Sequence, residues 1–336
     1  MRRKLTSALI KLWSKYVIAV LLSILVLPVN ADNTPVKVGV LKFGTVNWEL
    51  KSMLHGGHDT ANGVAVEIVP FASGDATRVA LQGGAVDVIV ADWLWVSRQR
   101  AEGQKVTFVP YSSSVGAVMV AADSPVKSLA DLKGKKIGVA GGPLDKSWLL
   151  LQGMAKQEHG VDIAAENEIA FGAPPLLAEK TRQGELDAML NYWHYCARLE
   201  ADGFKRLVSA EDAAAVLGST GPVSAIGYVF TDQWAADNPT AAMGFIKASR
   251  ATKALLGSSD EEWARLGESG AIKDKGAALT TLRDRFREGI PSRPVADEIK
   301  DADLLYSVLA ELGGPKLVGK SPSMAEGTYW PALLSQ

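Results

Sequence analysis

The chain has 336 residues, of which 47% are hydrophobic, and it carries 36 basic and 37 acidic side chains. This balance argues against a nucleic-acid-binding protein, which normally has a clear excess of Lys and Arg. The single cysteine, Cys196, excludes an intrachain disulfide and any zinc site made of several cysteines, so we expect a buried, inert thiol.

The first 31 residues have the pattern of a cleavable secretory signal. Five basic residues and no acid precede an apolar run from Val17 to Leu27, which small residues follow up to Ala31. This run is shorter than the about 20 residues that a membrane-spanning helix needs. We predict a signal peptide over 1–31, with an uncleaved anchor as the alternative. The rest would then hold 31 basic against 37 acidic residues, a formal charge of −6.

Strand-like and helix-like segments alternate after the leader. Apolar, β-rich runs at 36–41, 64–71 and 86–91 alternate with helical segments, which we place at 48–55, 75–82 and 94–102. Near-continuous apolar strands between helices are typical of parallel sheets that are covered on both faces. The sequence therefore predicts an α/β fold.

A second copy of this pattern follows, from residue 136 to residue 203. Segments 81–105 and 181–205 align without a gap, and seven of their 25 positions are identical, among them Asp87/Asp187 and Trp93/Trp193. Such self-similarity indicates one structural unit that is used twice. We therefore predict two open α/β lobes with a cleft between them.

Two apolar runs, 115–122 and 224–230, follow the two copies, and we interpret them as crossings between the lobes. From Asn238 onward the chain looks mainly helical, with Pro239 at a favourable first helical position. We expect these helices to pack on the first lobe. The resulting division is lobe one at 32–121 and 225–336, which is discontinuous, and lobe two at 122–224.

Tryptophans gather in the loops where such sheets bind ligands. In open parallel sheets ligands lie beyond the carboxyl ends of the strands. Five tryptophans lie in or just after these loops: Trp48, Trp93, Trp95, Trp148 and Trp193. Facing indoles would suit a flat or apolar ligand through stacking, or a quaternary ammonium through cation–π attraction. Packing of helix on sheet is the alternative, and we favour it for Trp95.

Small and polar residues of the same loops complete the predicted site. Their side chains would either contact a ligand or cap helices, and capping alone is the safer role for Asp145 and for the nearby Asp75. Free N–H groups at converging helix starts would favour an anion, and Lys42 and Lys146 would add positive charge. The predicted ligand-binding residues are Gly44, Thr45, Asn47, Trp48, Ser73, Gly74, Asp92, Trp93, Asp145, Ser147, Trp148, Asn191 and Trp193.

Patterns that would indicate catalysis, metal or cofactor binding are weak. A P-loop-like segment has Ala140 and Asp145 at its two obligatory glycine positions, so we reject nucleotide binding. His55 and His58 lack an evident acidic third ligand, which favours ordinary loop positions over a metal site. No Gly-x-Ser-x-Gly elbow occurs, and we interpret His194 as a pocket wall before a general base. We predict no catalytic residue, no metal and no cofactor.

Four stretches of the sequence resemble a known family. These are SLADLKGKKIGV at 128–139, LQGGAVD at 81–87, RQGELDA at 182–188, and Asn238-Pro239 with the helix that follows. Together they resemble the nitrate/sulfonate/taurine class of ABC-transporter solute-binding proteins, which is related to the aliphatic-sulfonate binders. The resemblance covers the chain after the leader, and it is specific for fold and role but not for the ligand.

This resemblance implies a type II periplasmic-binding fold with hinged lobes. It also implies a monomer in the periplasm that binds a small molecule and docks on an ABC permease with a separate ATPase subunit. The family's ligand contacts map here onto Gly44, Thr45, Ser73, Asp92, Ser147 and Asn191. The loop tryptophans and the acids at 92 and 145 depart from the family's pattern. They argue against a simple inorganic anion and favour an organic ligand, with anionic, aromatic and zwitterionic ligands left open.

Two other functions remain open at this point. A periplasmic sensor or accessory protein would have the same sequence features without serving transport. An enzyme on the same scaffold is the second alternative, because pyrimidine-synthesising proteins resemble this fold. The export leader and the lack of a catalytic constellation argue against the enzyme.

Overall fold

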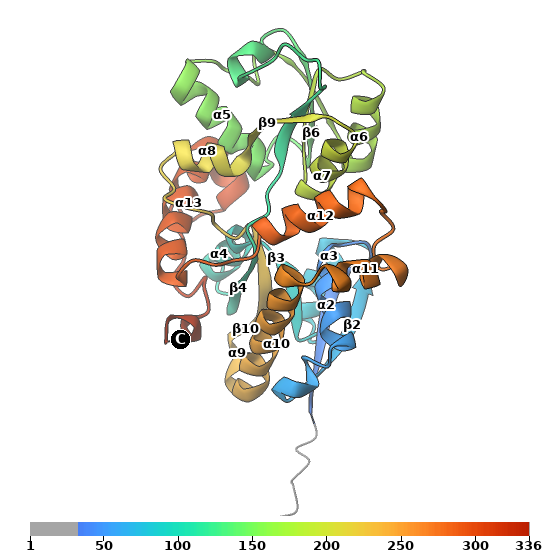
Figure 1. Ribbon diagram of the computed structural model, residues 1–336. Helices are drawn as coiled ribbons and strands as arrows, with labels where there is room; N and C mark the ends of the chain where they lie inside the picture. The colour runs from blue at the N-terminus through green and yellow to red at the C-terminus, as the bar shows by residue number, and fades with distance from the viewer. Residues whose placement is uncertain (1–32, 336) are drawn as a thin grey trace, which may run out of the picture. The chain divides into compact units, whose positions relative to one another are not determined.

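The computed structural model describes residues 33–335, and its framework is two five-stranded sheets (Figure 1). The predicted leader lies outside the described residues, and all elements below belong to the unit that begins at Thr34. The strands are β1 (Thr34–Leu41), β2 (Val64–Phe71), β3 (Val88–Ala91), β4 (Val106–Ser112), β5 (Ala117–Val120), β6 (Lys136–Ala140), β7 (Glu168–Gly172), β8 (Ala188–Asn191), β9 (Lys205–Ser209) and β10 (Ile226–Thr231).

Helices flank both sheets and form most of the C-terminal third. The α-helices are α2 (Val46–His55), α3 (Gly74–Gln82), α4 (Trp93–Ala101), α5 (Lys146–His159), α6 (Pro174–Arg182), α7 (Trp193–Ala201), α8 (Ala210–Val216), α9 (Asp232–Asp237), α10 (Pro239–Ser258), α11 (Asp260–Glu268), α12 (Ala277–Glu288) and α13 (Val295–Val318). Short 3₁₀ turns are η1 (Thr60–Asn62), η2 (Leu129–Leu132) and η3 (Pro331–Ser335). None of the helices within residues 33–335 is long and apolar enough to cross a bilayer.

The two sheets have the same strand order under the repeat. The first runs β2-β1-β3-β10-β4 and the second runs β7-β6-β8-β5-β9. In each, the first three strands are parallel, whereas the fourth is antiparallel to both of its neighbours. Four strands of each sheet therefore run in one direction, and only β10 in the first sheet and β5 in the second run the opposite way.

Continuous burial explains why the parallel strands are so apolar. Val36, Val38 and Val40 share one face of β1 and are at most 2% exposed, and Gly39 on the opposite face is also buried, so the middle of this strand is covered on both faces. Gly39 lies between them, and a Cβ there would come within 3.2 Å of Phe71 on β2. The side chains of Phe71, Val86 and Ile89 therefore fill the space that a larger residue at position 39 would need.

Strand β5 lies in the second sheet, although it follows the last strand of the first sheet. Ala117–Val120 pairs with β8 and β9. The chain thus passes from one sheet to the other between residues 112 and 117, before the predicted lobe boundary at 121/122. The boundary and the interpretation of 115–122 as a crossing are wrong in this respect, because an apolar run shows that it is a strand but not which sheet it joins. The chain returns to the first sheet between β9 and β10, within residues 210–225.

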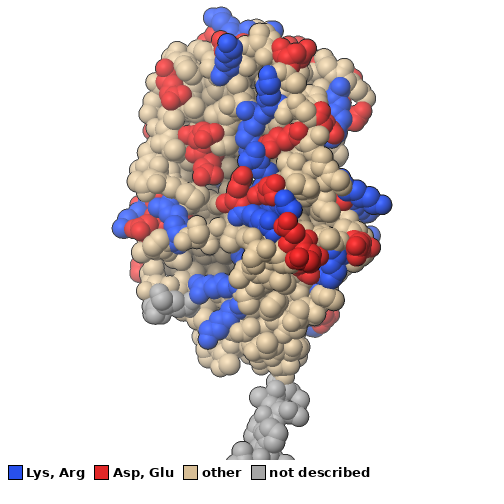
Figure 2. Space-filling view, in the orientation of Figure 1, with Lys and Arg blue, Asp and Glu red and all other residues tan. Residues whose placement is uncertain are grey.

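The C-terminal helices contact elements of both sheets, although we expected them to pack on the first lobe alone. Helix α12 packs against α7, which borders the second sheet, and α13 contacts both α4 and α5 (Figure 1). Basic and acidic side chains are interspersed over this region (Figure 2). The segment after α10 therefore joins the two halves of the described chain.

Candidate functional site

A cavity of about 370 Å³ lies among residues that belong to both sheets and to the segments that cross between them. Its walls come from the carboxyl ends of the parallel strands, the place where ligands bind in open α/β sheets. It is lined by Gly39, Val40, Leu41, Gly44, Thr45, Val46, Thr77, Val90, Asp92, Ser114, Val115, Gly116, Asp145, Lys146, Ser147, Tyr192, Trp193, His194, Ala225 and Ile226.

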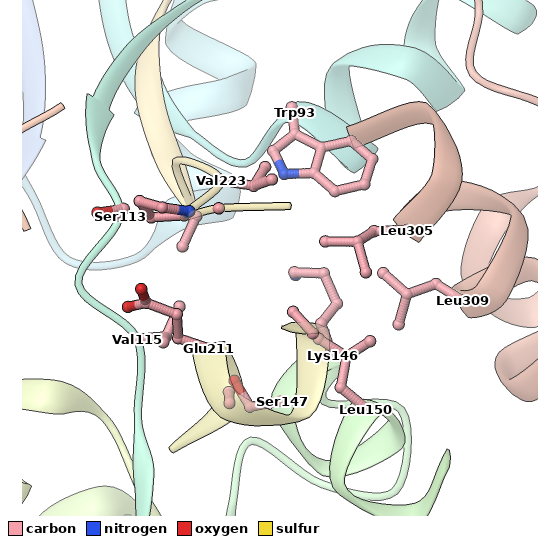
Figure 3. Close-up of a pocket in the computed structure, with 15 residues that line it drawn as sticks. Trp93, Ser113, Val115, Lys146, Ser147, Leu150, Glu211, Val223, Leu305 and Leu309 are labelled. Atoms are coloured by element: carbon pink, nitrogen blue, oxygen red, sulfur yellow. The ribbon is translucent and has the colours of Figure 1, made fainter. Parts of the chain in front are cut away.

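Two smaller cavities adjoin this one along the first crossing segment. A cavity of about 90 Å³ is bordered by Trp93 and shares Lys146 and Ser147 with the larger one (Figure 3). Another, of about 230 Å³, shares Ser114 and Trp193 with it. Val115 lines all three, so the crossing segment runs along the floor of one interrupted cleft.

Seven of the thirteen predicted residues line these cavities. Gly44, Thr45, Asp92, Asp145, Ser147 and Trp193 line the largest one, and Trp93 lines the cavity of about 90 Å³. They come from both copies of the repeat, and the structure brings them together. Their contact with a ligand remains a prediction.

The other polar and small predicted residues shape the loops or cap a helix and do not line the largest cavity. Asn47 Nδ2 donates to the carbonyl oxygens of Leu41 and Gly44, at 2.8 and 2.7 Å, and so fixes the loop before α2. Ser73 Oγ accepts a hydrogen bond from the backbone N–H of Ala76 and caps α3, of which Gly74 is the first residue. The expectation that Asp75 caps this helix is wrong, because Asp75 lies inside the first turn and pairs with Arg78 instead.

Asn191 also has a structural role. Its side chain is 1% exposed, Nδ2 donates to the carbonyl of Pro174 at 2.9 Å, and Oδ1 accepts from the N–H of Tyr192 at 2.8 Å. All of these bonds are local, so they tie the end of β8 to α6 and α7. The residue holds the loop that presents Tyr192 and Trp193 to the cavity.

The tryptophans do not face one another in the pairs that the duplication relates. Trp48 of α2 meets Trp193 of α7, with ring centroids 6.0 Å apart in an edge-to-face arrangement. Trp263 and Phe286 pack against the same rings, so Trp48 is only 6% exposed. Trp148 is 2% exposed in the core. Of the four, Trp93 and Trp193 line a cavity.

Two aspartates and one lysine place charge in the largest cavity. Asp92 Oδ1 accepts from the N–H of Trp95 at 2.9 Å, and Asp145 Oδ1 accepts from the N–H of Trp148 at 3.1 Å, so each carboxylate caps a helix. Lys146, from the second half, lies with Nζ 3.6 Å from Asp92 Oδ1 of the first half. Burial raises the pKa of Asp145, the Lys146 ammonium opposes the rise, and the Asp92 carboxylate adds to it.

His194, the second residue of α7, also lines the cavity, as the sequence predicted. Burial is the main cause that lowers its pKa to about 4, and the neighbouring Arg198 guanidinium lowers it further. Its Nδ1 is buried without a hydrogen-bond partner among the described residues. His194 is therefore neutral at physiological pH and contributes a polar but uncharged wall.

The crossing segments contribute lining residues that the sequence did not single out, namely Val115, Gly116, Ala225 and Ile226. They are apolar or small, so their composition carries no sign of a site. Only the switch of β5 and β10 between sheets brings them into the cleft. Gly116 has a clear local reason, because a Cβ there would come 2.0 Å from the carbonyl oxygen of Asn191.

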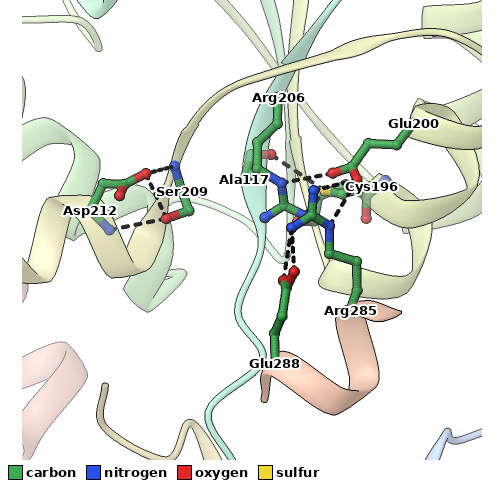
Figure 4. A network of polar contacts seen from close by, with 9 residues as sticks. Ala117, Cys196, Glu200, Arg206, Ser209, Asp212, Arg285 and Glu288 are labelled. Carbon is green, nitrogen blue, oxygen red and sulfur yellow. Dashed lines mark hydrogen bonds and ion pairs between the residues drawn. The ribbon is translucent and has the colours of Figure 1, made fainter. Parts of the chain in front are cut away.

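The Cys196 thiol lies behind the cleft and is buried, as predicted. Its Sγ donates toward the carbonyl oxygens of Asn191 and Ala117, and burial raises its pKa to about 11. Beside it, Glu200 accepts from Arg206 at 2.7 Å and from Arg285 of α12 at 2.8 Å (Figure 4). This network ties α12 to the second half. Within residues 33–335 no cluster of three or more His, Cys, Asp or Glu side chains could hold a metal ion.

Comparisons with known proteins agree with this geometry. The family model described as NMT1/THI5 like matches residues 56–261. The periplasmic aliphatic sulphonate binding protein SsuA from Escherichia coli is 19% identical, with a TM-score of 0.68 over 90% of this chain and 99% of that one. The alkanesulfonate-binding protein SsuA from Xanthomonas axonopodis pv. citri, bound to MOPS, is 17% identical, with a TM-score of 0.64 over 88% and 98%.

An ABC transporter structure from Parabacteroides distasonis is 14% identical, with a TM-score of 0.67 over 88% of this chain and 98% of that chain. No curated protein matches the sequence. At these identities the structural matches show the fold, and they confirm the predicted two-lobed α/β architecture of periplasmic binding proteins. They leave the ligand undetermined.

Proposed function

We propose, on the premise that this chain belongs to the NMT1/THI5-like family, that it is the solute-binding component of an ABC importer. The observation that carries the proposal is the cavity of about 370 Å³, whose walls come from both sheets. Its volume lies in the range of sites for small organic molecules. No nucleic acid, metal or cofactor enters the proposal.

The crossing segments give the proposed capture its mechanism. Residues 113–116 and 217–225 connect the sheets and border the cavity, so a change of backbone angles there would open and close the cleft. A ligand that contacts both halves favours the closed form by its differential affinity. In this proposal a membrane permease with a separate ATPase recognises that closed form.

The location and the ligand contacts belong to the same proposal. Export by the predicted leader would place the mature chain in the periplasm, as a monomer that meets its permease at the membrane. We propose that the ligand contacts the predicted residues that line the largest cavity, together with His194. These are Gly44, Thr45, Asp92, Asp145, Ser147, Trp193 and His194.

The chemistry of the cleft supports binding over catalysis. Its histidine has a pKa of about 4 and is neutral at physiological pH, and the only cysteine of the chain has a pKa of about 11 and remains a thiol. A thiolate nucleophile would need the opposite shift. We therefore propose a protein that captures its ligand without transforming it.

A ligand screen tests this function. Purified protein starting at Asp32 is heated with sulfonates, carboxylates, aromatic acids, amines and betaines, while tryptophan fluorescence is followed. A true ligand at 100 times its Kd should stabilise the fold by about 2.7 kcal/mol and raise the melting temperature. Thr45→Val should weaken that binding, whereas the exposed Thr60→Val should not. The proposal fails if no compound raises the melting temperature, and turnover of a compound would favour an enzyme.

A further inference from the structure

Two carboxylates from opposite halves of the molecule share the cleft. Asp92 follows β3 of the first sheet and Asp145 follows β6 of the second, and both line the largest cavity. The Asp92 carboxylate contributes to the raised pKa of Asp145, which is the effect of a nearby like charge. Each uses Oδ1 to cap its helix.

The two copies of the repeat differ in where they place these aspartates. At an offset of 100 residues, Thr45 corresponds to Asp145 and Tyr192 corresponds to Asp92. Neither Thr45 nor Tyr192 makes a side-chain cap on its helix. At these two pairs of corresponding positions each half therefore has one acidic N-cap, and the ion pair of Lys146 with Asp92 shows that the starts of α4 and α5 lie close together across the cleft.

Two cations of the chain itself lie beside Asp92, and neither makes a hydrogen bond of normal length to its carboxylate. Lys146 Nζ is 3.6 Å from Asp92 Oδ1, and Arg78 Nη2 is 3.8 Å from Asp92 Oδ2, both beyond a normal hydrogen bond. Their side chains are 37% and 32% exposed. Arg78 also pairs with Asp75 at 3.1 Å. Lys146 also lines the small cavity that Trp93 borders, where Figure 3 shows its side chain.

An anionic ligand group is disfavoured at this end of the cleft. The positive ends of α4 and α5 are already neutralised by their own carboxylate caps. A sulfonate placed there would lie against two carboxylates. A positively charged nitrogen would be attracted by both, and the aromatic rings of Tyr192 and Trp193 line the same cavity and can contact its substituents.

We propose, resting on the function proposed above, that the ligand carries a protonated or quaternary nitrogen, which Asp92 and Asp145 hold between the two halves. The nitrogen takes the position next to Asp92 that the Lys146 ammonium occupies in this structure. When the cleft closes, both carboxylates contact the same positively charged nitrogen. Binding of the cation is therefore coupled to closure.

Titration calorimetry with matched compounds tests the ligand class. Choline and 2-phenylethylamine are compared with 3,3-dimethylbutan-1-ol and 3-phenylpropan-1-ol, which lack the charge, and with butanesulfonate. We expect a cation to bind and its neutral counterpart and the sulfonate to bind at least tenfold more weakly. Binding of butanesulfonate or of an alcohol without a preference for the cation overturns this inference and leaves the proposed function intact. Failure of all five compounds overturns the inference, whereas the proposed function is decided by its own wider screen.

Variants that remove a charge give a second test, in which the affinity for the cation should fall for the aspartates and rise for the lysine. Asp92→Asn and Asp145→Asn should each weaken binding of the cation by about 10- to 100-fold, as expected for loss of a charge-assisted contact. Lys146→Met should strengthen it, because it removes the competing ammonium. Asp75→Asn is the matched control, since Asp75 pairs with the same Arg78 but is 90% exposed and does not line the cavity. Unchanged affinity in both aspartate variants, with melting temperatures like that of the parent, overturns the proposal.

Discussion

Two of the contacts between the halves, one aromatic and one ionic, differ in kind. On one side Trp48 and Trp193 pack edge to face and are covered by Trp263 and Phe286 of the C-terminal helices. On the other side Asp92 and Lys146 face each other at 3.6 Å, are partly exposed and are not hydrogen-bonded to each other. Buried aromatic surface holds structure together, whereas a loose ion pair can be exchanged. The difference supports a mainly structural role for Trp48 and fits our proposal that the charged side contacts the ligand.

The largest expected effect is on the aromatic side. Trp48→Ala should lower the free energy of unfolding by about 3–5 kcal/mol, because it removes a ring that is buried among three others. Urea denaturation measures the loss. Phe43→Ala, in the preceding loop, is the control: that ring is 84% exposed, and its removal should change stability by less than about 0.5 kcal/mol. Equal effects of the two variants would refute the assignment of a structural role.

The contrast between these two sides could not be predicted from the sequence. The sequence places Trp48 and Trp193 correctly, just after strands of the two copies, because local patterns determine where strands end. Which ring meets which depends on how the two sheets face each other and on Trp263, which lies far along the chain. That information is not local, so the sequence could not show that Trp48 meets Trp193.

The same reason explains the error at β5. Val118 and Val120 are apolar, so the strand itself is predictable from its composition. Its partners β8 and β9 are distant in sequence, and the run would suit either sheet. By contrast, the helix caps Ser73, Asp92 and Asp145 were predictable, because an N-cap lies within three residues of the N–H group that it accepts from.

The stability of the aromatic side should depend on pH through His194, which lies next to Trp193. The pKa of His194 is about 4 in the folded chain and about 6.5 when unfolded, so the unfolded chain binds more protons between these values. Stability is therefore unaffected by this group above about pH 6.5 and falls as the pH drops toward 4, by up to about 3 kcal/mol. His194→Gln removes that loss. Denaturation at pH 7 and pH 4.5 should show a smaller acid destabilisation in the variant than in the parent, and equal losses would contradict the assignment.

The ion pair that ties α7 to the chain before α12 should have an intermediate effect. Arg198 donates to Asp274 through Nε and Nη2, at 2.8 and 2.9 Å, and this pair lowers the pKa of Asp274. Both side chains are mostly buried, so Arg198→Met should cost about 1–2 kcal/mol of unfolding free energy. Lys300→Met removes an exposed pair with Asp297 and should cost almost nothing. A loss for Arg198→Met no larger than that of the control would show that the aromatic rings alone hold this side.

The smallest effect is expected on the charged side. Lys146→Met should change the free energy of unfolding by less than about 0.5 kcal/mol, because the ion pair with Asp92 is partly exposed and lacks a direct hydrogen bond. Urea denaturation of the ligand-free protein at low and high salt measures it. A loss of more than about 2 kcal/mol in the free energy of unfolding would show that Lys146 stabilises the fold as the tryptophans do. The distinction between the two sides would then be wrong. If the free energy of unfolding is unchanged, Asp92 still caps its own helix through Oδ1, and its carboxylate can exchange the lysine for another cation at little cost in stability.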